Sequence, residues 1–359
     1  MDQSLPDIPR KGRGAVSNRS GRYEAEARFA TDDGWGGAEA EPERLATTVT
    51  PDASRTVIAR NSSPDVPFDR SINPYRGCEH GCVYCFARPT HAWLGLSPGL
   101  DFESRLFAKH DAAALLAAEL RRPKYQCRVI ALGTNTDPYQ PIERELGITR
   151  GVLQVLSDFR HPVGIVTKSA LVGRDADILA PMSAHGLAAV FISVTTLDPG
   201  LARRLEPRAP TPARRLETIA GLSAAGVRVG VMTAPMIPGL NDAELEAILE
   251  AAAGAGAVSA SYVLLRLPLE IRDLFAEWLE AHAPDRAQRV LSLVRETRGG
   301  KLYDSTFGMR MRGQGPYAEL IARRFALAAR RSCLAGNRFE LETGLFRPPP
   351  APGDQLSLL

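Results

Sequence analysis

The chain has 359 residues, enough for one large domain or for a domain with extensions. It is 44% hydrophobic and 24% charged with a formal net charge of +3, which is the composition of an ordinary soluble protein. No apolar run approaches the ~20 residues that span a bilayer, and the N-terminal MDQSLPDIPRKGRG lacks the apolar region of a signal peptide. We therefore expect a cytoplasmic protein with no membrane segment.

Residues 1–64 are rich in Gly, Pro, Arg and Asp and show no sustained hydrophobic period, so we predict an irregular N-terminal arm. After it, short apolar runs alternate with stretches of helical periodicity. The predicted strands are 71–75, 128–133, 162–168, 187–196, 227–235 and 261–268, and the predicted helices are 111–122, 149–159, 174–186, 211–226 and 242–256. This alternation predicts an α/β fold, either an open sheet or a barrel, with parallel strands and crossover helices.

Polar side chains gather where these predicted strands end. They are Thr134, Asn135, Thr136, Asp137, Thr167, Lys168, Ser193 and Thr195. Open parallel sheets and barrels both bind their ligands at the carboxyl ends of the strands. We therefore expect the active site on this edge of the sheet.

The chain beyond the predicted core divides into two parts. Residues 284–340 are predicted to form a basic helical extension: between 281 and 331, eleven Lys or Arg stand against four Asp or Glu. With Tyr303, Phe307 and Tyr317 interleaved, this segment suits phosphate neutralisation and base stacking, and it equally suits a pair of solvated amphipathic helices. Residues 341–359 are predicted to be a Pro-rich flexible tail that ends in QLSLL.

Three cysteines, Cys78, Cys82 and Cys85, follow the first predicted strand at C-x3-C-x2-C spacing. Cys127 and Cys333 lie far from them and are expected to be ordinary thiols. In a reducing compartment such a cluster indicates metal. A zinc site usually needs a fourth ligand. A 4Fe-4S cluster held by three thiolates would keep one iron open.

The motif, with an aromatic residue, Tyr84, before its last cysteine, resembles the radical S-adenosylmethionine (SAM) superfamily. The resemblance implies a partial (β/α)6 TIM-type barrel over residues 65–283, with N- and C-terminal extensions. It also implies a 4Fe-4S cluster on Cys78, Cys82 and Cys85 whose open iron binds S-adenosyl-L-methionine. Reduction of the cluster would then cleave this cofactor to a 5′-deoxyadenosyl radical.

Residues 65–330 look most like the spore-photoproduct-lyase-like branch of this superfamily, through SINPYRGCEHGCVYCFARPTH, LGTNTDPYQPIE, VTKSALVGRDADIL, SVTTLDPGLARRLEPRAPTP and PMIPGLND. The resemblance implies that Thr134, Asn135, Thr136 and Asp137 meet the methionine amine or the substrate, Lys168 the cofactor carboxylate, Ser193 and Thr195 the ribose, and Tyr84 the adenine. Each of these residues also fits a purely structural role. The sequence NTDP is typical of a turn, Lys168 fits a solvated position, and Ser193 and Thr195 fit ordinary strand positions. Glu206 and Arg208 are further candidates for the cofactor, and His80 and His91 for outer contacts to the metal site.

By the same resemblance the expected activity is a lyase-like DNA repair reaction on DNA or a nucleic-acid lesion. Thr134 stands where photoproduct lyases carry a hydrogen-returning cysteine, a departure that bears on the specific reaction. One alternative is a radical SAM enzyme acting on a protein or small molecule. The other is a zinc-stabilised nucleic-acid-binding module without chemistry.

Two protein partners are expected. The family resemblance implies flavodoxin or ferredoxin as the reductant. The terminal Gln355, Leu356, Ser357, Leu358 and Leu359 resemble the short peptide by which bacterial replication and repair proteins dock on the DNA sliding clamp. An exposed apolar tail after a Pro-rich tether suits a pocket on a partner.

Overall fold

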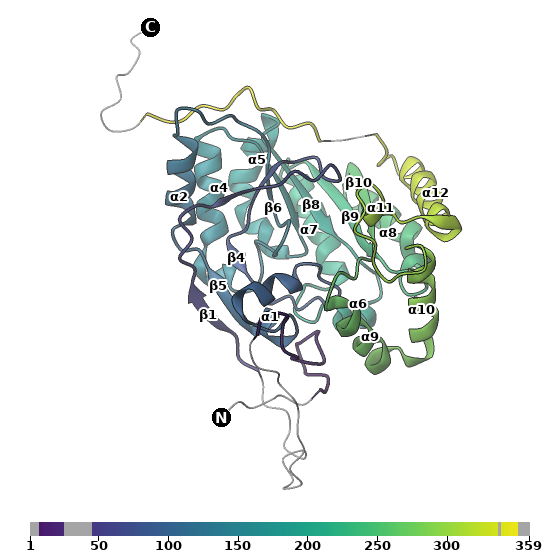
Figure 1. Ribbon diagram of the computed structural model, residues 1–359. Helices are drawn as coiled ribbons and strands as arrows, with labels where there is room; N and C mark the ends of the chain where they lie inside the picture. Colours follow the sequence, from purple (N-terminus) through teal and green to yellow (C-terminus); the bar gives the residue numbers. More distant parts are fainter. Residues whose placement is uncertain (1–6, 25–44, 337–338, 351–359) are drawn as a thin grey trace.

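A seven-stranded sheet lies at the centre of the computed structural model, which describes residues 7–24, 45–336 and 339–350. Its order is β10 (Ser259–Leu264), β9 (Val229–Met236), β8 (Ala188–Ser193), β7 (Val163–Thr167), β6 (Ile130–Leu132), β3 (Arg70–Ile72) and β2 (Ile58–Arg60). All neighbours are parallel except β2, which is antiparallel to β3. The six predicted strands are confirmed, and the fold is the predicted partial (β/α)6 barrel, with helices around its strands (Figure 1).

Crossover helices pack on the outer face of the sheet and confirm the five predicted helices. They are α2 (Ala112–Leu120), α4 (Ile148–Asp158), α5 (Ala176–Ala184), α7 (Pro212–Ala224) and α8 (Leu245–Gly254). The shorter α3 (Glu143–Leu146), η3 (Ala170–Asp175), α6 (Pro199–Leu205) and η4 (Asp242–Glu244) complete the connections. The start of α7 is set locally, because the Thr211 hydroxyl accepts the Arg214 amide and Pro212 occupies the first turn.

The main core lies between the strands and these helices. Ile165 of β7 and Val190 of β8 are fully buried there against a layer that includes Leu153 of α4 and Ile248 of α8. Burying one such aliphatic side chain contributes roughly 1.5–3 kcal/mol. The uniformly apolar strand sequences thus reflect strands covered by helices on one side and by the barrel interior on the other.

A second sheet of three strands was not predicted from the sequence. Its order is β1 (Thr48–Pro51), β5 (Arg105–Ala108) and β4 (Tyr75–Arg76), and η2 (Arg88–Leu94) and α1 (Leu100–Ser104) precede β5. Both β1 and β2 belong to the arm that was predicted to be irregular, so this prediction is wrong for these residues. Strands of two to four residues are too short to show a hydrophobic alternation.

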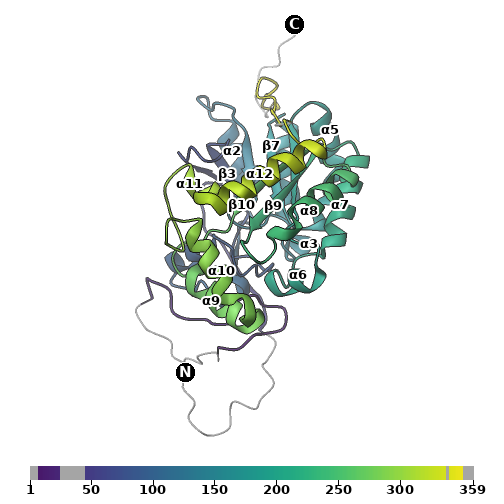
Figure 2. The same ribbon diagram turned by 90° about the vertical axis from the view of Figure 1, so that its right-hand side faces the viewer.

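Residues 284–340 contain α10 (Pro284–Glu296), α11 (Met309–Arg312) and α12 (Gly315–Arg331), which agrees with the helices expected there. Before them, α9 (Ile271–His282) ends the segment that was assigned to the barrel. Helices α9 and α10 pack on each other, and α12 packs on α8 (Figure 2). Trp278 of α9 is fully buried and donates its indole N–H to the Arg204 carbonyl at 2.9 Å. Among the described helices, none combines the length and apolar character needed to cross a membrane.

Residues 339–350, which we call the strap, run across the amino-terminal ends of the strands (Figure 1). The Glu342 amide donates to the Gly186 carbonyl and the Arg347 amide to the Phe159 carbonyl, each at 3.0 Å. The Phe346 ring centre lies 5.4 Å from that of His161. The flexible tail predicted from residue 341 therefore does not describe residues 341–350, while Gln355, Leu356, Ser357, Leu358 and Leu359 lie outside the described residues.

Candidate active site

The three clustered cysteines lie on a tightly turned loop, residues 78–85, which we call the cysteine loop. The Gly81 amide donates to the Cys78 carbonyl at 3.3 Å and the Cys85 amide to the Cys82 carbonyl at 3.2 Å. Gly81 has φ +67°, and a Cβ there would lie 2.7 Å from a Glu103 carboxylate oxygen. Cys78 and Cys82 are buried and Cys85 is half-buried.

A cavity of about 270 Å³ brings this loop together with the carboxyl ends of the barrel strands. Its lining residues are Val66, Phe68, Cys78, His80, Cys82, Tyr84, Cys85, Phe86, Gly133, Thr134, Asn135, Asp137, Val166, Thr167, Lys168, Ser193, Met232, Ala234, Pro235, Val263, Leu264, Arg266 and Met311. Within the described ranges, no three His, Cys, Asp or Glu side chains are arranged to hold a metal ion. The cavity lies on the edge of the sheet where the sequence predicted an active site.

Asp137 ties the cysteine loop to two strand ends. Its carboxylate accepts the Thr167 hydroxyl at 2.7 Å and the Lys168 amide at 2.9 Å, and it lies 3.3 Å from His80 Nδ1. Burial alone would raise the pKa of Asp137, but the neighbouring His80 and these hydrogen bonds outweigh it and lower the pKa to about 2. Asp137 is therefore a fixed negative charge that positions the loop and strands β6 and β7.

Tyr84 is held by a buried group of polar side chains. Its hydroxyl donates to the Glu206 carboxylate, which also accepts the Thr195 hydroxyl at 2.7 Å and forms an ion pair with Arg215. Glu206 and Arg215 are almost completely buried. Lys168 Nζ lies 5.8 Å from the Tyr84 ring centre, so one ring face meets a cation inside the cavity.

The structure brings most of the predicted site residues into one cavity: Cys78, Cys82, Cys85, Tyr84, Thr134, Asn135, Asp137, Lys168 and Ser193 all line it. Thr136 and Thr195 are not among its lining residues. Thr136 donates its hydroxyl to the Tyr75 carbonyl at 2.8 Å, and Thr195 donates to Glu206. Both hydroxyls thus bond to protein groups, and the sequence could not tell which side of each turn faces the cavity.

The other named candidates divide between the cavity wall and the surrounding structure. His80 lines the cavity, whereas His91 lies 2.9 Å from the Arg105 carbonyl and edge-on to Phe102. Arg208 forms an ion pair with Glu79 at 2.8 Å. The thiols of Cys127 and Cys333 lie outside the cavity lining, in agreement with their expected ordinary role.

Sequence reasoning missed a cationic and aromatic group at the cavity edge. The Arg266 guanidinium lies 5.0 Å from the Phe86 ring centre, and its Nη1 lies 3.4 Å from the Met311 sulfur, a weak acceptor. Arg266 Nε is buried without a hydrogen-bond partner, and no carboxylate in the described part of the chain forms an ion pair with Arg266. The available signal was a single charged residue inside the otherwise apolar predicted strand 261–268.

Three of the eleven basic side chains counted between residues 281 and 331, Arg298, Arg310 and Arg324, bond to carbonyls or carboxylates of the fold. Arg298 is buried and donates to the Leu265 carbonyl at 2.8 Å. Arg310 forms an ion pair with Asp65 and Arg324 with Glu246, while the Tyr317 hydroxyl donates to Asp242 at 2.6 Å. The segment is therefore less available to phosphates than its sequence suggests, although Phe307 remains 55% exposed.

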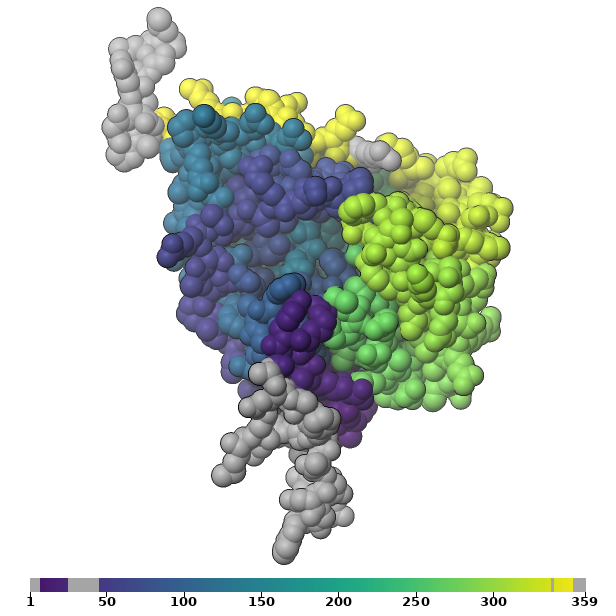
Figure 3. Space-filling model, in the orientation of Figure 1, coloured from purple at the N-terminus to yellow at the C-terminus, as the bar shows by residue number. Residues whose placement is uncertain are grey.

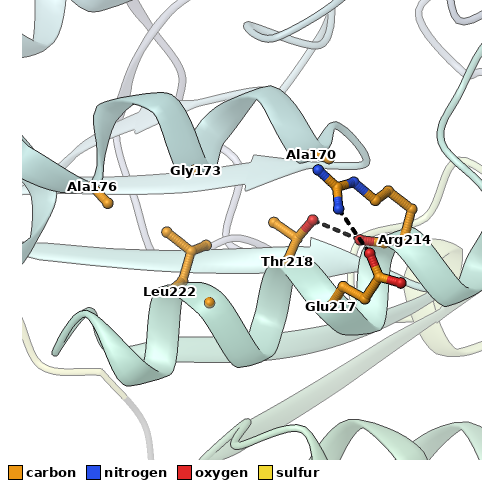
Figure 4. A pocket seen from close by; sticks show the side chains of 8 residues that line it. Ala170, Gly173, Ala176, Arg214, Glu217, Thr218 and Leu222 are labelled. Carbon is orange, nitrogen blue, oxygen red and sulfur yellow. Dashed lines mark hydrogen bonds and ion pairs between the residues drawn. The ribbon is translucent and has the colours of Figure 1, made fainter.

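A second hollow lies outside the barrel between η3 and α7 (Figure 4). Small residues, Ala170 and Gly173, face the Leu222 and Thr218 positions of α7 across it. The Thr218 hydroxyl donates to the backbone carbonyl of Arg214 at 2.7 Å within the helix. We attribute this hollow to loose packing between two elements, since it holds none of the predicted site residues.

Comparison with known proteins identifies relatives over the same region. The sequence profile of the radical SAM superfamily matches residues 72–252. An uncharacterised protein of Mycobacterium tuberculosis is 39% identical over 232 residues, which cover 64% of this chain and 68% of that protein. An uncharacterised protein of Methanocaldococcus jannaschii is 29% identical over 173 residues, which cover 48% of this chain and 62% of that protein.

Solved structures agree with the fold. Spore photoproduct lyase complexed with dinucleoside spore photoproduct matches with a TM-score of 0.55 at 14% identity, covering 79% of each chain. A double mutant of that enzyme with bound AdoMet and dinucleoside spore photoproduct matches with a TM-score of 0.53 at 14% identity, covering 79% of this chain and 78% of that one. At this identity the likeness is one of fold.

The matched region contains the whole cysteine loop, the last residue of β3 and all of β6, β7, β8 and β9. The family implies use of SAM with an iron–sulfur cluster. Because the superfamily profile covers half of the chain, and a relative shares 39% identity across 68% of its own length, this chain belongs to the radical SAM superfamily of enzymes.

Proposed function

We propose that Cys78, Cys82 and Cys85 bind a 4Fe-4S cluster and that its fourth iron takes S-adenosylmethionine. The observation that supports this most directly is the gathering of these three thiols, with polar strand ends, around one cavity. The donor set fits such a cluster with one open iron, because full ligation takes four thiolates. When bound, the cluster supplies the electron that cleaves the cofactor reductively to a 5′-deoxyadenosyl radical.

The remaining cavity residues are proposed to hold the rest of the cofactor. Lys168 carries the positive charge that suits a carboxylate, and the Ser193 hydroxyl suits the ribose. The Tyr84 ring, fixed from behind by Glu206, provides a rigid face for the adenine. Thr134 and Asn135 are the polar side chains proposed to meet the amine or the substrate.

Anaerobic reconstitution with iron and sulfide tests this assignment. We expect a brown protein with about four irons per chain, as one such cluster holds, that forms 5′-deoxyadenosine from SAM when reduced. A colourless protein that retains zinc instead would support the zinc-stabilised binding module. The proposed reductant is flavodoxin or ferredoxin and the proposed compartment is the cytoplasm, so each reductant should be compared with dithionite in the same assay.

Nucleic acid is the proposed substrate, and the assay should therefore include damaged DNA. The support from this chain is Arg266, a cation at the cavity edge that lies over the Phe86 ring and forms no ion pair with a carboxylate among the described residues. A guanidinium with unused donors suits a phosphate, and an aromatic face suits a base. The complex of spore photoproduct lyase with a dinucleoside photoproduct adds an analogy of fold. A protein or small-molecule substrate remains the competing proposal.

Fluorescence anisotropy with labelled single-stranded and duplex oligonucleotides distinguishes the two. Arg266→Gln should weaken binding roughly tenfold, because charge-assisted hydrogen bonds contribute about 1.5–3 kcal/mol, and wild-type affinity should fall with added salt. Arg122→Gln is the matched control, since it removes one exposed positive charge at the end of α2, beside the strap. Equal affinities for both variants, or no salt-dependent binding at all, would favour the competing substrate.

We also propose that the terminal Gln355–Leu359 peptide docks on the DNA sliding clamp. The Arg121 guanidinium donates a hydrogen bond to the Pro349 carbonyl at 2.8 Å, on the side of the barrel opposite the cavity. This bond supports the proposal, because it places the last described part of the chain away from the cavity. A clamp bound beyond this point would leave the cavity free for DNA. Pull-down with purified clamp, comparing the full chain with one lacking residues 355–359, tests this; equal retention would refute it.

A further inference from the structure

The N-terminal arm lies directly against the cysteine loop. Residues 13–17 are buried, and the arm segment 7–24, purple in Figure 3, lies on the surface between the blue start of the barrel and the green α9 region. A Cβ built on Gly14 would lie 1.8 Å from the Gly81 carbonyl oxygen and 3.3 Å from the Val83 amide nitrogen. The backbone of the arm therefore touches the backbone of the loop at a point between Cys78 and Cys82.

A buried carboxylate couples the arm to the loop. Glu103 is fully buried and accepts the amides of Gly14 at 2.9 Å and Ala15 at 2.8 Å. It also pairs at 2.5 Å with Arg88, which is itself fully buried. Arg88 in turn donates to the Gly81 carbonyl at 3.1 Å and the Cys82 carbonyl at 2.9 Å. The arm is thus linked through the Glu103–Arg88 ion pair to the carbonyls of Gly81 and Cys82.

A second set of contacts reaches the other end of the loop. Arg13 donates to the Glu103 carbonyl at 2.6 Å and to the Thr47 hydroxyl at 3.2 Å. The Thr47 hydroxyl donates to Glu79, the second residue of the cysteine loop, at 3.0 Å. Glu79 also pairs with Arg208 at 2.8 Å. The arm therefore holds the loop on both sides of its central turn.

We propose that residues 13–18 are a cover that fixes the cysteine loop in its cluster-binding shape and shields the bound cluster from solvent and dioxygen. This inference rests on the proposed cluster at Cys78, Cys82 and Cys85. It assigns Gly14 and Glu103 as positioning residues, since they act through the loop and do not line the cavity. Solvent exposure and hydrogen bonding around a cluster are the protein's means of tuning it, which gives such a cover a chemical purpose.

The test uses the full chain and the variant Gly14→Ala, whose added methyl group has no space against the Gly81 carbonyl. In the metal-free protein, alkylation by iodoacetamide is followed by mass spectrometry. We expect Cys82 to react about tenfold faster than in the wild type, while Cys127 and Cys333 keep their rates, because the overpacking opens only this region. After reconstitution, the brown chromophore of the variant should bleach faster in air.

Gly173→Ala is the control, because Gly173 lies in η3 away from the arm, does not have a left-handed φ and has nothing within 4 Å of an added Cβ. It should leave both readouts close to wild type. Glu103→Gln provides a second variant if Gly14→Ala does not fold, and it should expose Cys82 in the same selective way. Unchanged alkylation of Cys82 in both folded variants would overturn the cover, as would equal acceleration at Cys127.

The two proposals fail in distinguishable ways. If the wild-type protein takes up no iron, the proposed function fails while the alkylation result still reports on the arm. If iron is bound but Gly14→Ala alters neither alkylation nor bleaching, the cover alone is wrong.

Discussion

The two ends of the barrel are closed by different chemistry. At the carboxyl end, the N-terminal arm covers the cysteine loop through buried charges such as the Glu103–Arg88 pair. The cavity beside it is lined by Arg266, which forms no ion pair with a carboxylate of the described residues. At the amino end, the strap covers the strands with aromatic contacts from Phe339 and Phe346. We infer from the difference that the carboxyl end is built for the proposed ligands at some cost in stability, whereas the amino end mainly provides stability.

The largest expected effect comes from removing a cysteine of the loop, which should abolish iron binding at the carboxyl end without changing stability at the amino end. Cys82→Ala should reduce bound iron and 5′-deoxyadenosine formation to background, because it removes one of three proposed ligands. The thermal unfolding of the metal-free protein should change little, since the strap is untouched. Iron analysis and product assay measure the first effect and circular dichroism the second. Cys127→Ala is the control and should keep its iron, and a Cys82→Ala protein that still forms product would disprove the ligand assignment.

The reverse experiment removes an aromatic side chain that anchors the strap. Phe346 packs between Tyr125 and His161, with ring centres 5.4 Å from each. Phe346→Ala should lower the free energy of unfolding by about 2 kcal/mol, below the range for a fully buried ring because Phe346 is half-buried. Urea denaturation measures this free energy of unfolding. Leu345→Ala, at a residue 40% exposed, should change it by less than about 0.5 kcal/mol. If Phe346→Ala also reduced iron uptake, the two ends would not be independent.

A smaller effect is expected from Tyr84, whose ring is part of the cavity wall proposed to bind SAM. Tyr84→Phe removes the hydroxyl that bonds to Glu206 but keeps the ring proposed to face the adenine. Because the ring is then held less firmly, SAM binding should weaken by at most about fivefold, the equivalent of roughly 1 kcal/mol. Equilibrium binding to the reconstituted enzyme measures this. Tyr317→Phe removes a hydroxyl bonded to Asp242, outside the cavity, and is the control. Equal affinities in wild type and Tyr84→Phe would show that the bond to Glu206 does not position the ring for the cofactor.

The smallest effect is a pH dependence at the amino end. Burial lowers the pKa of His161 to about 4, and nearby Arg70 acts in the same direction. Since the unfolded chain has a histidine pKa of about 6.5, it binds more protons below that value, so stability is complete above pH 6.5 and is lost as pH falls toward 4. Lowering pH from 7.5 to 6.0 should cost about 0.8 kcal/mol through His161.

The variant His161→Gln isolates that contribution. Urea denaturation of both proteins at the two pH values should give a smaller loss in the variant. Because His161 contacts the strap and lies far from the cysteine loop, iron uptake should be the same in both. An identical pH dependence in the two proteins would show that His161 does not titrate as its burial predicts.

The sequence predicted what depends on local pattern. Five of the six predicted strands lie in mainly apolar runs, and the cysteine spacing with Tyr84 is visible in eight letters. Asp137 was expected in the site, but its bonds to Thr167 and His80 depend on how three loops meet. Thr136 was expected there too, and it points elsewhere because neighbouring residues of a turn face different directions.

What the sequence could not show are contacts between distant residues. Gly14 and Glu103 are 89 positions apart, and nothing periodic links them. Arg266 gained its significance only because β10 ends beside the cysteine loop and α11 lies near it. The strap looked like a solvated Pro-rich linker because its anchoring phenylalanines are isolated in sequence and meet their partners only through the fold.

The separation between Gly14 and Glu103 has a consequence for synthesis of the protein. Residues leave the ribosome in order, so the arm emerges first, the three thiols next and the carboxylate that binds the arm last. For that interval the thiols are accessible and the arm has no docking site. Cluster insertion during this period would need no displacement of the arm, so a slow translation step after residue 85 would favour maturation of the enzyme.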